Sequence, residues 1–413
     1  MSELVKQGDE QTLAQIGLPR TPNIDPSAYP KEDFELYSVP SFSFGKPEVV
    51  PGNVIGSTKQ LVQPGDVLLC KIVPHLVRVW CVPRQGAHRQ IASGEWIVVR
   101  PDPSAVDRHY LRYALIEPGF RGQFMDTVSG VGGSLMRARP KAVARIRVPV
   151  PAIHEQCRIV AKLDALLGRT KNAGKELARI PRLVARYKQA VLVKALKGDL
   201  TADWRDRHGC QSDKWQEKSL GEIADIGTGS TPKRGETRYY KNGTIPWVTS
   251  AAVNKPRIDA VDQFITQAAL KETNCKIFPA GALLIAMYGE GQTRGRVAVL
   301  GISAATNQAL AAIQIRSRNE VSADFVLWFL RANYLELRMQ AAGGVQPNLN
   351  LGIIKAIRIS LPSIHEQQEI VKCIEKAVNH IDMLFSEATR ASDLLDRLDK
   401  ATLAKAFQGQ LAG

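Results

Sequence analysis

The sequence predicts an α+β protein with two copies of an α/β domain and two long helices. Three observations support this fold class. A segment of the chain is repeated, the repeated segment has a heptad pattern of apolar residues, and short apolar runs bounded by turn residues precede each copy. The length of 413 residues favours two globular units over one. Hydrophobic residues make up 44% and charged residues 23%, as is typical of folded proteins.

The repeat organises the chain. Residues 146–200 match residues 357–411 at a constant offset of 211 without a gap. Both copies contain the sequence Ile-His-Glu-Gln, at 153–156 and at 364–367, and a proline stands two residues before each. Chance does not produce such a match, so the chain is a tandem of two related halves, with a pseudo-twofold internal repeat.

Each copy has the heptad pattern of a coiled-coil helix. In the second copy one row holds Ile374, Ile381, Ala388, Leu395 and Thr402, and the other holds Ala377, Leu384, Ala391 and Leu398. The equivalent rows of the first copy are Leu163, Thr170, Leu177, Val184 and Val191, and Leu166, Ala173, Ile180 and Tyr187. We expect the two helices to pack as an antiparallel coiled coil. The alternative is that each helix lies on its own domain. Gly174 and Pro181 should kink or interrupt the first helix.

The segments before the helices are predicted to be α/β domains. Strands are expected at Val67 to Ile72, Trp96 to Val99, Ala282 to Met287 and Val297 to Leu300, and helices at Asp107 to Phe124 and Ser322 to Met339. In both segments a helix and then a glycine-rich loop follow the strands. The predicted boundaries are 1–148 for the first domain, 149–204 for the first helical region, 205–360 for the second domain and 361–413 for the second helical region. Residues 1–30 have no counterpart and are expected to be a loose extension.

The net charge of +15 favours a polyanionic partner. The basic excess lies in the first three regions, while residues 361–413 carry 6 basic and 8 acidic side chains. The six cysteines are scattered singly, without metal-ligand spacing, and are expected to be reduced thiols in the cytoplasm. No apolar stretch is long enough for a membrane span, and the beginning of the chain has no export signal.

Motifs of catalysis are missing from the sequence. There is no nucleotide-binding GxxxxGK[ST] loop, no HExxH, no GxSxG and no Asn/Asp-Pro-Pro-Tyr sequence. The glycine-rich residues 289–295 lack the Lys-Ser/Thr pair and are interpreted as a connection. Glu155 and Glu366 fall in the first helical turn, where a carboxylate interacts favourably with the helix dipole. We therefore expect no catalytic residues and no metal site.

Basic, aromatic and amide side chains cluster in both domains, as in proteins that contact duplex DNA. Arginine and lysine bind phosphates and guanine edges, and glutamine pairs with adenine. The alternative is a solvated charged loop above buried aromatic residues. The predicted DNA contacts are Lys71, His75, Arg78, Arg84 and Arg89 in the first domain, and Thr231, Lys233, Arg234, Trp247, Thr249, Tyr288, Gln292 and Arg294 in the second.

From about residue 34 to the end, the chain resembles the specificity subunits of Type I restriction-modification enzymes. The resemblance lies in the paired helix starts at 151–156 and 362–367 and in the helix ends at 190–201 and 401–411. It also includes Gly229-Ser230-Thr231-Pro232 followed by Ile245-Pro246-Trp247-Val248, which is similar to the start of a target recognition domain. The first domain lacks this opening, so the two domains are expected to read different sequences.

The resemblance implies a non-catalytic reader of double-stranded DNA in which each domain contacts one half of a bipartite target and the helices act as a spacer. It implies two methyltransferase subunits and motor-nuclease subunits as partners. S-adenosylmethionine, ATP and Mg would be bound by those partners, and no cofactor by this chain. Two alternatives stay open: a self-contained methyltransferase or nuclease with fused recognition domains, and a membrane-surface protein that uses the basic helix at 178–197.

Overall fold

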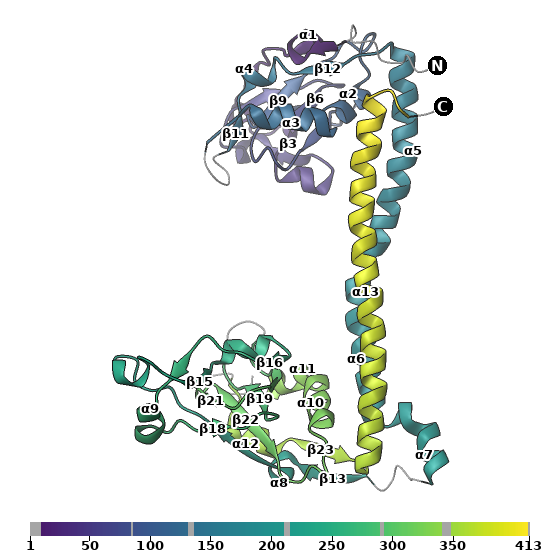
Figure 1. Ribbon diagram of the computed structural model, residues 1–413. Coiled ribbons are helices and arrows are strands. Elements are labelled where there is room, and N and C mark those ends of the chain that lie inside the picture. Colours follow the sequence, from purple (N-terminus) through teal and green to yellow (C-terminus); the bar gives the residue numbers. More distant parts are fainter. Residues whose placement is uncertain are drawn as a thin grey trace. The chain divides into compact units, whose positions relative to one another are not determined.

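The computed structural model describes residues 10–83, 86–130, 136–209, 215–289, 293–340 and 348–411. Two compact units result: unit 1 comprises residues 1–178 and 388–413, and unit 2 comprises residues 179–387 (Figure 1). Each unit contains one domain of strands and short helices, together with segments of two long helical stretches. The predicted α+β class is confirmed. None of the described helices is both long and apolar enough to cross a lipid bilayer.

The domain of unit 1 contains two sheets that pack on each other. One has the order β7 (Val79–Cys81), β6 (Val67–Cys70), β9 (Trp96–Val99), with antiparallel pairs. The other has the order β2 (Asn23–Ile24), β5 (Lys59–Leu61), β8 (Arg89–Ala92), β3 (Asp33–Tyr37), β4 (Glu48–Pro51), and β3 runs parallel to β8. Side chains alternate along β6, so Leu68 packs toward the second sheet and Leu69 toward a layer of helices.

The helix layer of unit 1 consists of α1 (Leu13–Gly17), α2 (Arg108–Ala114), α3 (Pro118–Asp126) and α4 (Pro140–Val143). The helix predicted at Asp107 to Phe124 is thus two helices. Pro118 stands at the first position of α3, where its missing N–H costs nothing, and the preceding Glu117 accepts hydrogen bonds as the N-cap.

The expectation that residues 1–30 form a loose extension is wrong for the described residues from 10 onward. β1 (Glu10–Thr12) pairs with β12 (Arg147–Pro149), and Leu13 and Ile16 of α1 are buried in the core. The second domain has the same arrangement, because β13 (Gln216–Ser219) pairs with β23 (Arg358–Leu361) and leads into α8 (Leu220–Ile223). Both short helices begin with a capping box, which the sequence analysis did not use.

The domain of unit 2 repeats this architecture with a five-stranded and a four-stranded sheet. One sheet has the order β14 (Ala224–Thr228), β22 (Leu310–Ile315), β19 (Leu283–Ala286), β20 (Val297–Leu300), β16 (Arg257–Ile258). The other has the order β17 (Phe264–Ile265), β15 (Ile245–Val248), β21 (Ala304–Thr306), β18 (Ile277–Phe278). The helices are α9 (Gln267–Glu272), α10 (Ala323–Ala332), α11 (Tyr334–Gln340) and α12 (Leu351–Ala356). The trio β20-β19-β22 therefore corresponds to β7-β6-β9, and the prediction of two related α/β domains is confirmed.

The first helical copy is interrupted and the second is not. α5 (Ile153–Leu177) and α6 (Ile180–Leu196) are separate helices, and Pro181 lies in the first turn of α6. The predicted interruption is therefore confirmed at the proline, whereas Gly174 lies inside α5 without breaking it. α13 (Ile364–Phe407) has no proline and continues for 44 residues.

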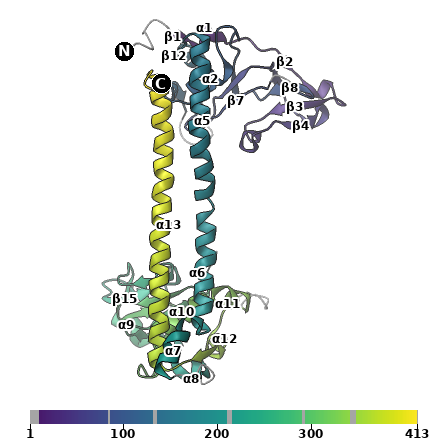
Figure 2. The same ribbon diagram turned by 90° about the vertical axis from the view of Figure 1, so that its right-hand side faces the viewer.

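In each unit the two helical segments lie side by side and run antiparallel (Figures 1 and 2). In unit 1 the hydroxyl of Thr170 donates a hydrogen bond to Asp399 at 2.6 Å, and Leu163 packs with Leu403. The residue numbers therefore increase along one helix in the direction in which they decrease along the other. In unit 2 Lys188 forms an ion pair with Asp382, and Leu192 packs in a cluster with Ile374. The predicted antiparallel pairing is confirmed within each unit.

One predicted heptad row is shielded and the other is not. Leu163, Ile374 and Ile381 are buried, but Leu166, Tyr187, Leu384 and Leu398 are between 40% and 63% exposed. In α5 and α6 the second row that is shielded from solvent lies one residue after the predicted row of Leu166 and Ala173. A straight helix turns every 3.6 residues, so its buried face drifts away from a strict seven-residue pattern.

Candidate nucleic-acid interface

The strand register of unit 2 brings several loops to one edge of its larger sheet. β14 ends at Thr228, opposite Ala311 near the start of β22, and β19 ends at Ala286, opposite Leu310. The N–H of Asn307 donates to the carbonyl of Val248 at 3.0 Å, which brings the end of β15 to the same edge. We name this set of loops the loop edge of unit 2; it consists of residues 229–235, 249–254, 287–289, 293–296 and 307–309.

Most of the predicted DNA contacts in the second domain fall on this loop edge. Lys233, Arg234 and Tyr288 have exposed side chains there. Thr231, Thr249 and Arg294 are half-buried. The sequence separates these positions by up to 63 residues, and only the strand pairing brings them together. Gln292 lies outside the described residues.

The loop at 229–232 is held in place by groups beneath it. Its Ser230 carbonyl accepts a hydrogen bond from the indole of Trp247 at 3.2 Å and from the thiol of Cys275 at 3.2 Å. The Tyr240 hydroxyl donates to the carbonyl of Pro232 at 2.5 Å. Burial raises the pKa of Tyr240, so the hydroxyl keeps the proton that it donates.

The DNA contact predicted for Trp247 is therefore corrected. Its side chain is 2% exposed and packs in a core cluster with Ile245 and Ile265. The indole cannot reach a duplex from this position, because it is already enclosed and its N–H is used on the loop. The sequence could not reveal this, since an aromatic residue near the end of a short apolar strand fits a buried position and a stacking position equally well.

Gln308 is a loop-edge residue that the sequence analysis missed. Its side chain is exposed, and its carbonyl oxygen accepts a hydrogen bond from the Thr231 hydroxyl at 2.5 Å. This leaves the amide N–H groups of Gln308 directed away from Thr231, and a glutamine amide can pair with adenine. The loop that carries Thr231 passes close to the backbone of Thr306. This approach requires Gly229, because a Cβ there would lie 1.8 Å from the Thr306 carbonyl oxygen.

Unit 1 has a corresponding loop edge. β6 ends at Cys70, opposite Trp96 at the start of β9, and the N–H of Lys71 donates to the carbonyl of Glu95 at 2.9 Å. The N–H of Ser93 donates to the carbonyl of Tyr37 at 3.1 Å, which is the counterpart of the Asn307 and Val248 contact in unit 2. We name residues 38–47, 71–78 and 93–95 the loop edge of unit 1; it contains the predicted contacts Lys71, His75 and Arg78.

One other predicted contact of the first domain, Arg89, lies away from this edge. Arg89 stands at the opposite end of β8, where it pairs with Glu32 at 3.0 Å and its guanidinium lies 4.9 Å from the centre of the Tyr29 ring. The structure thus separates it from Lys71, His75 and Arg78, and its DNA contact stays a prediction. Arg84 lies outside the described residues.

Two arginines beside the loop edge of unit 1 were missed from the sequence. Arg121 of α3 donates to the His75 carbonyl at 3.3 Å, and Arg137 pairs with Glu95 at 3.2 Å. Arg137 also belongs to an isolated β-bridge with Ile72. These arginines are remote from Lys71 in sequence, and no local pattern identified them.

The repeated Glu-Gln at the start of each long helix joins that helix to its domain. In unit 1 the buried Gln156 side chain accepts from the Asp107 N–H at 2.8 Å and donates to the Ala105 carbonyl at 2.9 Å. In unit 2 the buried Gln367 accepts from the Ser322 N–H at 2.8 Å and donates to the Glu320 carbonyl at 2.9 Å. In both cases the glutamine forms hydrogen bonds with the backbone around the N-cap of an earlier helix of the domain, α2 or α10, and so fixes the domain to the start of the long helix.

The two glutamates have different surroundings. Glu366 is 2% exposed and accepts hydrogen bonds from Arg205 of α7 (Ala202–His208) at 2.6 Å, from Thr201 at 3.0 Å and from the indole of Trp215 at 3.2 Å. Glu155 pairs locally with Arg158, three residues on, at 2.6 Å. The interpretation of both as helix-dipole partners is thus incomplete, because Glu366 is the centre of a buried ion pair.

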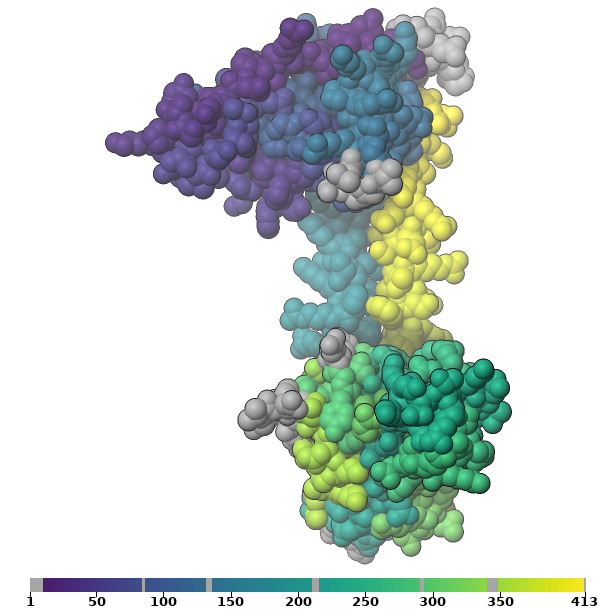
Figure 3. Space-filling model, turned by 90° about the vertical axis from the view of Figure 1, so that its left-hand side faces the viewer, coloured from purple at the N-terminus to yellow at the C-terminus, as the bar shows by residue number. Residues whose placement is uncertain are grey.

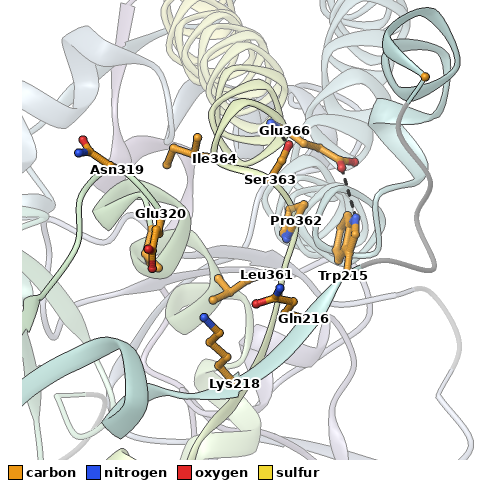
Figure 4. Close-up of a pocket in the computed structure, with 12 residues that line it drawn as sticks. Trp215, Gln216, Lys218, Asn319, Glu320, Leu361, Pro362, Ser363, Ile364 and Glu366 are labelled. Atoms are coloured by element: carbon orange, nitrogen blue, oxygen red, sulfur yellow. Dashed lines mark hydrogen bonds between the residues drawn. The ribbon is translucent and has the colours of Figure 1, made fainter.

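A pocket of about 660 Å³ opens beside Glu366 (Figure 4). Figure 4 shows Lys218, Gln216 and Glu320 around it, with Trp215 bonded to Glu366 at its rim. The described residues contain no group of three or more metal-ligating side chains, there or elsewhere. The pocket lies where α13 begins, away from the loop edge of unit 2.

Comparison with known proteins places these observations in a family. Residues 212–385 match the family model of the Type I restriction modification DNA specificity domain. The Type I restriction enzyme StySPI specificity subunit of Salmonella potsdam is 27% identical over 293 residues, which are 68% of this chain and 61% of that protein. The EcoKI specificity subunit of Escherichia coli K12 is 26% identical over 290 residues, again 68% and 61%. The matched region thus spans about three fifths of these relatives.

Solved structures share the fold over nearly the whole chain. The HsdS subunit of Thermoanaerobacter tengcongensis has a TM-score of 0.64 at 21% identity and covers 98% of both chains. A chain from a structure of the type I R-M system has a TM-score of 0.76 at 22% identity, covering 99% of this chain and 100% of that one. The resemblance seen in the sequence is confirmed: the second domain belongs to the Type I restriction modification DNA specificity domain family, and the chain resembles the specificity subunits of Type I restriction-modification enzymes.

Proposed function

We propose that this chain is the DNA specificity subunit of a Type I restriction-modification enzyme and reads a bipartite target, one half with each domain. One observation carries the proposal. Both domains present a loop edge at the same end of equivalent strands, and each edge gathers basic side chains from distant parts of the sequence. The proposal rests also on relatives that are themselves specificity subunits.

The two loop edges differ in composition, which supports recognition of two different half-sites. The first offers Lys71, His75 and Arg78, with Arg121 beside it. The second offers Lys233, Arg234, Arg294, Tyr288 and the Thr231–Gln308 pair. Lysine and arginine would hold phosphates, while arginine and glutamine would read base edges in the major groove. The net charge of +15 supports salt-dependent attraction to DNA.

The proposal assigns no catalytic group to this chain. Two methyltransferase subunits would modify adenine with S-adenosylmethionine, and motor-nuclease subunits would use ATP and Mg. The alternative is a self-contained methyltransferase or nuclease, whereas the relatives compared above are specificity subunits. A methylation assay on the purified chain, with and without methyltransferase subunits, separates the two. Adenine methylation by the chain alone would contradict the proposal.

A domain exchange tests modular reading directly. Residues 214–356 would be replaced by the equivalent domain of a relative, and the modified motif of the host would be read by methylome sequencing. We expect one half of the motif to change and the other to stay. The matched control replaces residues 10–146 and should change the opposite half. If either exchange altered both halves, the two domains would not read DNA independently.

A further inference from the structure

One aromatic side chain of the first domain has no role in the core or in the contacts described above. Phe44 is 77% exposed, the highest value for any large hydrophobic side chain in the part of the chain that the structure describes. It lies in the 38–47 segment between β3 and β4, which belongs to the loop edge of unit 1. In Figure 3 the purple and violet region of unit 1, which contains this segment, projects from the blue body of the domain.

The loop that carries Phe44 is held in one conformation. The Ser38 N–H donates to the Ser41 hydroxyl oxygen and the Ser41 N–H to the Ser38 hydroxyl oxygen, both at 3.1 Å. Phe42 packs against the rings of Trp80 at 5.5 Å and Trp96 at 6.1 Å. The loop is thus anchored through Phe42, while Phe44, two residues further, points into solvent. An ordered loop loses little entropy when it binds a partner.

The position of the loop identifies its partner. β3 runs parallel to β8, and both strands end where Lys71 contacts the turn at 93–95. Phe44 therefore extends the same loop edge that carries Lys71, His75 and Arg78. The exposed Lys46 follows two residues later in the chain, so the same loop also carries a cation. An aromatic ring next to a lysine on a DNA-facing loop has the chemistry of an apolar wedge between base pairs.

We propose that Phe44 inserts between two base pairs of the half-site read by the first domain and unstacks that step. This inference rests on the proposed function, since it needs the loop edge of unit 1 to face DNA. It adds a specificity determinant that makes no hydrogen bond to a base. Steps that unstack at low cost, such as pyrimidine–purine steps, would then be preferred at that position.

The test uses the full chain assembled with its methyltransferase subunits and a duplex that carries the target found by methylome sequencing. Phe44→Ala should weaken binding by tenfold to a hundredfold, on the order of the loss when one stacking aromatic is removed, and Phe44→Trp should retain most of the affinity. The matched control is Val54→Ala. Val54 is 67% exposed, but it follows the end of β4 that pairs with the start of β3, away from the loop edge. It should bind as wild type does.

A second readout detects the wedge itself. With 2-aminopurine placed at successive adenines of the first half-site other than the methylated one, which the methyltransferase itself would unstack, wild type should raise the fluorescence at one step and Phe44→Ala should not. Wild type that fails to distinguish the target from a scrambled duplex would refute the proposed function. Wild type that distinguishes them, with Phe44→Ala binding equally tightly, would overturn only the inference on Phe44. An affinity loss without any fluorescence rise in wild type would also overturn insertion between base pairs.

Discussion

The buried pair between Arg205 and Glu366 gives the sharpest test of how the second domain is joined to its helix. The side chains are 11% and 3% exposed, and their charged atoms lie 2.6 Å apart. Removing one partner of a buried pair leaves the other charge without compensation, which costs about 3–5 kcal/mol. Glu366→Ala would also leave the Thr201 hydroxyl and the Trp215 indole without this acceptor. We expect a loss of unfolding free energy in unit 2 at the upper end of that range.

The repeat supplies a matched control. Glu155 occupies the equivalent position in unit 1, but its pair with Arg158 is local, and the arginine is 42% exposed. Surface pairs of this kind contribute roughly 0.2–1 kcal/mol. Glu155→Ala should therefore destabilise unit 1 by less than about 1 kcal/mol. The same substitution at two repeat-related positions thus has two different expected costs, because Glu366 has a buried cationic partner and two further donors, whereas the partner of Glu155 is exposed.

The assay is urea unfolding of the full chain, followed by tryptophan fluorescence, which reports on both units, since Trp80 and Trp96 lie in unit 1 and the other four tryptophans in unit 2. A double variant, Arg205→Met with Glu366→Leu, completes the experiment. Because it removes both charges, it should recover most of the stability that Glu366→Ala loses. Equal costs for the Glu155 and Glu366 substitutions, or a double variant less stable than Glu366→Ala, would refute the reasoning.

Three further predictions follow from individual contacts. Gly229→Ala should destabilise unit 2 by about 1–3 kcal/mol, since the added Cβ would lie 1.8 Å from a carbonyl oxygen and the backbone must move; unchanged urea unfolding would contradict this. Burial, and then the hydrogen bond to Asp164, raises the pKa of Tyr113 to about 12. Its neutral form is thus favoured in the fold, and this stabilisation is complete below pH 10 and lost as pH rises toward 12. Tyr113→Phe should therefore lose stability less steeply than wild type across this interval. A seven-residue insertion after Thr170, with another after Leu398, adds about 10 Å to both helices at opposing levels. If the paired helices set the gap between half-sites, methylome sequencing should find it longer by roughly three base pairs, whereas an active enzyme with an unchanged gap would exclude the helices as the spacer.

The sequence by itself determined the plan of the molecule. The constant offset of 211 established two related halves, and the heptad rows established long helices. The strands and the interruption at Pro181 could be located because local signals cause them: alternating or continuous apolar runs, turn residues, and a proline that cannot donate a backbone hydrogen bond. A repeat is also the strongest evidence for architecture in a single sequence, since each copy must bury its apolar face in the same way.

The tertiary structure alone decided which polar and aromatic residues are available to a partner. Trp247 is enclosed and Arg89 is paired at the far end of a strand, while Gln308 and Arg121 stand at loop edges without a local signature. Strand pairing decides these positions, and pairing depends on the global register, which composition does not specify.

The repeated Glu-Gln shows the same difference between what the sequence determines and what the tertiary structure decides. The sequence located both copies, but it did not show that the glutamine fastens the helix to the backbone of its domain. Nor could it show that Glu366 is buried against Arg205, whereas the partner of Glu155 is Arg158, whose side chain is 42% exposed. Identical residues acquire different surroundings because each fold surrounds them with a different set of distant segments. The physical reason is that burial and hydrogen bonding are properties of neighbours in space, whereas the repeat specifies only neighbours along the chain.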